Sequence, residues 1–186
     1  MQLNSRYRRQ ARWWAVLAIV LSTGGVTASE PEDELKAATV LSFLRYSEWP
    51  GATASDRLLA VGVLGRPSLV ATFRNALEGK QVDNRLVKVL ELPEPASACC
   101  QIVFLASEKP ADLRPALAAA LGMRALTIGV SKEFLELGGA IQLLIVDGRM
   151  SFEVNREALE RSGITISSKL LRFGQIRKGG KGKPPA

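Results

Sequence analysis

The chain has 186 residues, a formal net charge of +7, no histidine and two cysteines, the adjacent pair Cys99 and Cys100. Without histidine, the sequence excludes His-dependent catalytic triads, His-based metal sites and an imidazole general base, and two adjacent cysteines cannot supply the four ligands of a tetrahedral zinc site. The positive charge is concentrated at the ends, because residues 1–28 and 177–186 each carry four basic residues while residues 29–176 have 17 basic against 18 acidic ones. This balance disfavours nucleic-acid binding. The sequence predicts a protein that is not an enzyme and has no cofactor.

Residues 1–28 have the three-part layout of a secretory signal. Four arginines form a basic head, an apolar run follows over 13–21, and small residues precede Ser29. The apolar segment is shorter than the ~20 residues that a membrane-spanning helix needs, and no cysteine stands near the cleavage point to carry a lipid anchor. We therefore expect cleavage after Ala28, release into the periplasm, and no direct insertion of the mature chain into the membrane.

The first half of the mature chain predicts alternating helices and strands. Apolar residues at helical spacing indicate a first helix, which ends before Pro50 because the residue preceding a proline avoids the helical region. Pro67 suits the first position of a second helix, and Gly79 suits its left-handed exit. In order, the expected elements are a helix over 32–46, a strand over 58–64, a helix from Pro67 through Leu77, a strand over 86–92 and a proline-rich loop over 93–98.

The middle of the chain predicts two buried strands. Residues 101–106 form a continuous apolar run, as in a strand that is buried on both faces, and residues 125–130 form another. Between them, Asp112 is expected to cap a helix whose apolar positions recur every four residues, at Leu113, Leu117 and Leu121. After the second strand, Ser131 is expected to open a short helix that ends at Gly138-Gly139.

The last third predicts a hairpin followed by two helices. Asp147-Gly148 is the favoured two-residue turn between strands over 140–146 and 150–154. Asn155 is expected to cap a helix that exits at Gly163, and Ser167 to start a last helix through about Phe173. Strands alternating with helices and closed by a hairpin give a three-layer α/β domain, with a mainly parallel sheet, a C-terminal antiparallel hairpin and helices on both faces. We expect one domain over 29–176 and a basic flexible tail over 177–186.

The adjacent cysteines leave three arrangements open: two thiols of which one is buried, a vicinal disulfide, or bonds to a second chain. The vicinal disulfide is strained, because neighbouring Cα atoms lie ~3.8 Å apart and the usual disulfide spans roughly 4.4–6.8 Å. We expect one buried and one exposed thiol, and an inter-chain bridge that makes a homodimer stays open in oxidising surroundings. A redox role for Cys99 and Cys100 is a hypothesis on the same basis.

Two apolar groups are candidates for binding a partner protein. Trp49 and Arg45 belong to an aromatic cluster at the end of the first helix, and both residue types dominate binding hot spots. Leu170 and Phe173 lie in a last helix that carries more large apolar side chains than its length can bury. For each group the alternative is ordinary packing against the sheet.

Two blocks of sequence carry a family resemblance. FLRYSEWP spans residues 43–50, and GGAIQLLIVDGRMSFEVNREALERSGITISSKLL spans residues 138–171. In their order and spacing they resemble the YfiR family, periplasmic negative regulators of membrane-bound diguanylate cyclases, over about residues 34–176. The resemblance implies binding and repression of an inner-membrane signalling protein, through the periplasmic domain of a diguanylate cyclase or a similar sensor, and so control of cyclic di-GMP. YfiR-like proteins often carry more than one pair of cysteines distant in sequence, an arrangement that this chain lacks.

A second function from another class stays open. A periplasmic sensor or solute-binding module would hold a small ligand at the mouth of the parallel sheet, where α/β domains commonly bind their ligands.

Overall fold

The structure, a computed structural model, describes residues 31–49, 57–92 and 100–177. The elements are, in chain order, α1 (Pro31–Tyr46), β1 (Ser47–Glu48), β2 (Leu58–Leu64), α2 (Pro67–Leu77), β3 (Gln81–Val82), β4 (Arg85–Glu91), β5 (Ile102–Leu105), α3 (Pro110–Gly122), β6 (Leu126–Gly129), β7 (Ile141–Val146), β8 (Arg149–Asn155), α4 (Arg156–Ser162), β9 (Thr165–Ile166), α5 (Ser168–Leu171) and β10 (Gln175–Arg177). The predicted signal, the proline-rich loop and the tail after Arg177 lie outside the described residues.

Eight strands form one sheet in the order β10-β8-β7-β6-β5-β2-β4-β3, and β1 pairs with β9 in a separate small sheet. Strands β2, β4, β5, β6 and β7 run parallel to one another, whereas β3, β8 and β10 run in the opposite direction. The β7–β8 hairpin is the predicted one, with Asp147 and Gly148 both at positive φ in its turn. The mainly parallel sheet with a C-terminal antiparallel hairpin is thus confirmed.

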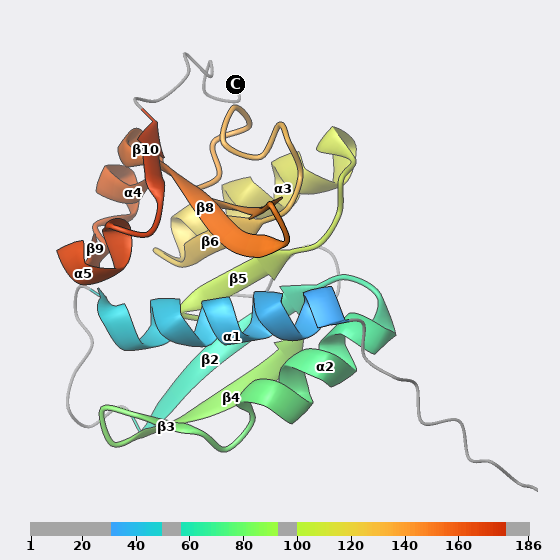
Figure 1. Cartoon of the computed structure of the whole chain (residues 1–186), viewed down its shortest axis with the longest axis vertical. Coiled ribbons are helices and arrows are strands. Elements are labelled where there is room, and N and C mark those ends of the chain that lie inside the picture. Colours follow the sequence, from blue (N-terminus) through green and yellow to red (C-terminus); the bar gives the residue numbers. More distant parts are fainter. Residues whose placement is uncertain (1–30, 50–56, 93–99, 178–186) are drawn as a thin grey trace, which may run out of the picture.

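Strand β5 divides the core into two layers, because all four of its side chains are buried. Ile102 and Phe104 point to the cluster that contains α1 and α2, whereas Val103 and Leu105 point to the cluster that contains α3. Alternating side chains of a strand face opposite sides of a sheet, so a run of four apolar residues requires cover on both faces. Helices α1 and α2 provide it in front of the sheet and α3 behind it (Figure 1). The predicted three-layer arrangement is confirmed.

A buried carboxylate attaches the start of α1 to the turn between β2 and α2. Asp33 is 2% exposed, and its Oδ2 accepts a hydrogen bond of 2.5 Å from a guanidinium NH2 group of Arg66. Lys36 Nζ lies 3.2 Å from the other oxygen of Asp33. Because a buried charge is costly unless it is paired, these contacts fix where α1 begins above the sheet.

The segment over 131–138 is a succession of turns and not the helix expected from Ser131. Phe134 explains the difference, since its fully buried ring lies against the backbone of Gly129 and Gly139, where a Cβ on either glycine would overlap the ring. The chain therefore wraps around this ring and returns to the sheet at β7. A large side chain held between two glycines takes precedence over local helical propensity.

Two further expectations about helix ends are wrong. Helix α3 begins at Pro110, with Lys109 as its N-cap. Asp112 lies within the first turn, where its carboxylate accepts a 2.7 Å hydrogen bond from Ser107 Oγ. Proline at the first helical position set the boundary there. The last helix, α5, ends at Leu171, and the chain continues as β10, which pairs with β8 and includes Arg177 from the predicted tail.

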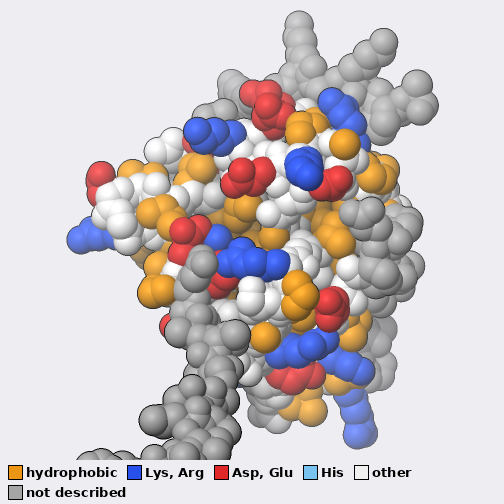
Figure 2. Space-filling model, turned by 90° about the vertical axis from the view of Figure 1, so that its right-hand side faces the viewer, with side chains coloured by type: hydrophobic (Ala, Val, Ile, Leu, Met, Phe, Trp, Pro, Cys, Tyr) orange, Lys and Arg blue, Asp and Glu red, His pale blue; other side chains and the backbone are white. Residues whose placement is uncertain are grey.

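Figure 2 shows basic and acidic side chains interspersed on the face that it presents, in keeping with the near-neutral charge of residues 29–176. In the part of the chain that the structure describes, no helix is long and apolar enough to cross a membrane.

Replacing Gly129 with alanine should destabilise the domain, because the new methyl group would overlap the ring of Phe134. Overpacking of this kind costs about 1–3 kcal/mol, which urea unfolding measures. The control is Gly122→Ala at the end of α3, where a Cβ would meet no atom within 4 Å. This control should leave stability unchanged or raise it slightly, by up to about 1 kcal/mol. Equal stability of the two variants would contradict the packing described for Phe134.

Candidate partner-binding site

The two blocks that carried the family resemblance meet in space at the end of α1. Ser47 pairs with Ile166 and Glu48 with Thr165 in the antiparallel β1–β9 sheet. Next to it, the backbone N–H of Ser167 donates a 2.8 Å hydrogen bond to the carbonyl of Tyr46. Helix α5 therefore starts beside the end of α1 (Figure 1). We call this region, formed by residues 45–48 and 165–173, the α1–α5 junction.

Two buried aromatic rings pack against each other in the core next to the junction. The rings of Phe43 in α1 and Phe152 in β8 meet edge to face, with centroids 5.1 Å apart. Gly174, directly before β10, has its backbone against the ring of Phe152, where a Cβ would overlap that ring. The chain can therefore leave α5 close to the sheet and enter β10.

The structure places the four candidate partner-binding residues in different environments. Phe173 is 77% exposed and Arg45 is also exposed, so both offer their side chains to solvent at the junction. Leu170 is only 8% exposed and belongs to the core cluster beneath α1 and α2. Trp49 is half-buried against the same cluster, and its Nε1–H donates a 2.9 Å hydrogen bond to the carbonyl of Gln101.

Of the four predicted residues, only Arg45 and Phe173 are exposed, and the structure adds a third exposed residue, Tyr46. Tyr46 is 45% exposed and lies between Arg45 and β1. Lys169 and Arg172 are exposed as well, so basic residues outnumber the single acidic Glu48 among residues 45–48 and 165–173. An exposed aromatic ring among cations suits a partner with apolar and acidic side chains.

The structure describes one of the two adjacent cysteines, Cys100. Cys100 is buried and lies before β5, not within it, and its Sγ lies beside Gly62 of β2. Cys99 lies outside the described residues, so the exposed thiol, the inter-chain bridge and the redox role stay predictions. Within the described ranges, no cluster of three or more acidic or cysteine side chains is placed to hold a metal ion.

Residues 33–175 match the YfiR/HmsC-like family, which is most of the chain. The protein belongs to the YfiR/HmsC-like family. No curated protein matches the chain. The family match begins at Asp33, the buried carboxylate of α1, and ends at the first residue of β10, so it covers both halves of the α1–α5 junction.

Alanine variants of Leu170 and Phe173 should differ in stability, because the first side chain is in the core and the second is at the surface. Leu170→Ala removes buried methyl groups and should cost about 2–5 kcal/mol of unfolding free energy. Phe173→Ala, at a side chain that is 77% exposed, should change stability by less than about 0.5 kcal/mol. Thermal and urea unfolding measure both values. A large loss of stability in Phe173→Ala would mean that its ring is part of the core.

Proposed function

We propose that this YfiR/HmsC-like protein is a periplasmic, non-enzymatic regulator that binds the periplasmic domain of an inner-membrane diguanylate cyclase and keeps that enzyme inactive. Family membership carries the proposal. The exposed Phe173 at the α1–α5 junction supports it, because a large aromatic side chain that is mostly in water is a typical anchor of a protein–protein interface.

Repression would follow from differential affinity for two states of the partner. A bound protein shifts a conformational equilibrium only as far as it prefers one state. The junction suits such a role, because its backbone is fixed by the β1–β9 pairing while Arg45, Tyr46 and Phe173 remain exposed. A surface that is ordered before binding loses little conformational entropy on association.

Phe173→Ala should weaken both partner binding and repression. Truncation of a hot-spot residue costs roughly 2 kcal/mol or more, which is about thirtyfold in affinity. Co-purification of the tagged chain with the cyclase from a detergent extract measures binding, and the cellular level of cyclic di-GMP measures repression. The matched control is Leu86→Ala in β4, which also truncates a half-exposed apolar side chain but lies near the opposite edge of the sheet.

Two results would overturn this assignment of the surface. Normal repression by a folded Phe173→Ala variant would place the interface elsewhere. Equal loss in the Phe173 and Leu86 variants would mean that the effect is not specific to the junction. Trp49→Ala is a less informative variant, because the lost hydrogen bond to Gln101 and the lost packing would also reduce stability.

The exported protein should begin at Ser29, because residues 1–28 have the charged head, short apolar run and small residues of a cleavable signal. Mass spectrometry of the protein isolated from a periplasmic extract gives the terminus directly. An intact N-terminus on the exported protein would contradict cleavage after Ala28.

A small-ligand sensor remains a second candidate because of one observation. A cavity lined by both polar and apolar groups lies between α3 and α4. It lies at the amino ends of β6 and β7, because Ala125 and Ala140, which directly precede these strands, line it. This position differs from the expected mouth at the carboxyl ends of the parallel strands.

A further inference from the structure

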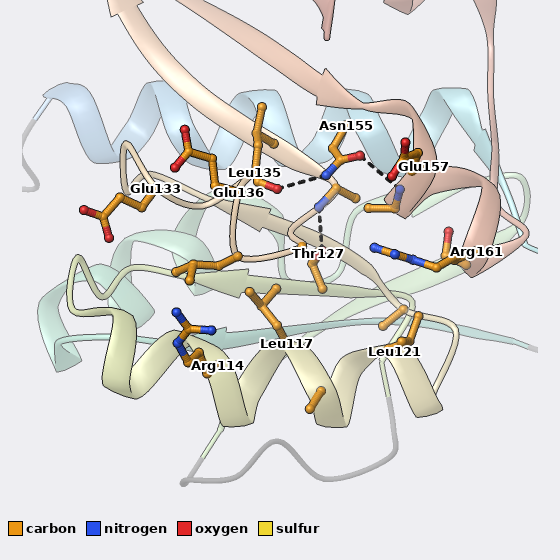
Figure 3. Close-up of a pocket in the computed structure, with 17 residues that line it drawn as sticks. Arg114, Leu117, Leu121, Thr127, Glu133, Leu135, Glu136, Asn155, Glu157 and Arg161 are labelled. Atoms are coloured by element: carbon orange, nitrogen blue, oxygen red, sulfur yellow. Dashed lines mark hydrogen bonds between the residues drawn. The ribbon is translucent and has the colours of Figure 1, made fainter. Parts of the chain in front are cut away.

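The cavity between α3, the 131–138 turns and α4 has a volume of about 530 Å³ (Figure 3). This volume falls within the range of roughly 300–1,000 Å³ that is typical of small-molecule sites. The partner surface described above does not involve it, since its walls come from α3, the turns and α4.

The walls of the cavity are held in place without a ligand. Asn155 caps α4, as predicted, because its side-chain oxygen accepts a 3.1 Å hydrogen bond from the N–H of Ala158. Its Nδ2 group donates a 2.9 Å hydrogen bond to the carbonyl of Leu135. One buried side chain thus joins the start of α4 to the turns. The turns are fixed in addition by the ring of Phe134 between two glycines. A preformed cavity avoids the entropic cost of ordering on binding.

A cation faces the interior of the cavity. Arg161 extends from α4 toward the space above α3 in Figure 3, and its NH2 group lies 3.8 Å from where a Cβ of Gly138 would stand. Within the described ranges, this guanidinium makes no ion pair or hydrogen bond. A guanidinium that has no partner and faces a partly enclosed space is suited to a carboxylate, which it binds through two parallel hydrogen bonds.

A hydroxyl group at the floor adds a second donor. Thr127 is 7% exposed, and its Oγ1 accepts a 2.9 Å hydrogen bond from the N–H of Ala140. The hydroxyl hydrogen donates to no described residue, so it remains available to an acceptor in the cavity. Thr127 and Arg161 both lie at the side of the cavity formed by α4 and the sheet (Figure 3).

The side of the cavity formed by α3 is apolar. Leu117 and Leu121 rise from α3 into it (Figure 3). Leu121 continues the predicted spacing of leucines but is 49% exposed, whereas Leu113 is fully buried. An exposed leucine at a position where the helical pattern predicts burial is explained by the cavity beside it, since an apolar ligand would bury its side chain.

Three acidic residues line the cavity, namely Glu157, which is on α4 with Arg161, and Glu133 and Glu136 of the turns. Glu133 and Glu136 extend from the turns away from Arg161 in Figure 3. A second arginine, Arg114 of α3, lies on the same side as these two carboxylates and offsets their field.

We propose that this cavity binds a small organic acid, whose carboxylate lies against Arg161 and Thr127 and whose apolar ring or branched chain lies against Leu117 and Leu121. Binding is a property of the chain alone and does not depend on the proposed control of a cyclase.

Isothermal titration of the purified chain with three compounds of the same shape tests the proposal. The probes are 3-phenylpropionate, its neutral analogue 3-phenylpropionamide and the cation 2-phenylethylamine. The acid should bind at least about tenfold more tightly than either analogue, because only the acid offers a charged acceptor to Arg161. Equal binding of all three compounds, or no binding of the acid, would overturn the proposal.

Binding measurements on variants test whether the acid binds in this cavity. Arg161→Gln should weaken binding of the acid by about tenfold or more, whereas Arg156→Gln should not. The control removes the same charge from the same helix, at a side chain whose Nε bonds Glu160 at 2.8 Å. Ala118→Phe, which fills the cavity from an exposed position on α3, should abolish binding while the melting temperature stays near that of the parent. Unchanged binding in either folded cavity variant would place the acid elsewhere and refute the assignment.

Discussion

Helix α1 is attached at both of its ends to elements that are distant in sequence. At its start, the buried Asp33 forms an ion pair with Arg66, in the turn before α2. At its end, the chain continues into β1, which pairs with β9. Removing one partner of a buried charge leaves the other uncompensated, at a cost of several kcal/mol. The position of α1 over the sheet, and with it the position of Arg45 and Tyr46 at the α1–α5 junction, therefore depends on polar contacts at the helix ends as well as on apolar packing between them.

Helix α4 lies between the proposed ligand cavity and the α1–α5 junction in the chain. Its Arg161 faces the cavity, and only residues 162–164 separate it from β9, which pairs with the end of α1. Ser162, the first of these three residues, is buried, and its hydroxyl group donates a 2.7 Å hydrogen bond to the carbonyl of Leu159. Gly163 follows at a φ of 71°, a conformation that ends the helix. The cavity and the junction are consequently close along the chain although different elements form them.

The two surfaces differ in chemistry in a way that fits different ligands. The junction presents a protruding ring among cations, which suits the broad contact of a protein partner. The cavity is lined by two arginines and two leucines, Arg114, Arg161, Leu117 and Leu121, which suits a small molecule whose ends differ in polarity.

The sequence by itself determined the longer helices and strands and the layers that they form. The apolar run of β5 required cover on both faces, Asp147-Gly148 set the hairpin, and Asn155, Pro67 and Gly163 set helix ends, because each of these signals acts through a few neighbouring residues. The order and spacing of two blocks also indicated the YfiR family. Only the tertiary structure decided that the 131–138 segment wraps around Phe134, that β1 pairs with β9, and that Leu170 is buried while Phe173 is exposed. These features depend on contacts between residues far apart in the chain. Strands of two residues are too short to show a periodicity in the sequence. Whether an apolar side chain of a short segment is buried or exposed depends on which other elements pack against it.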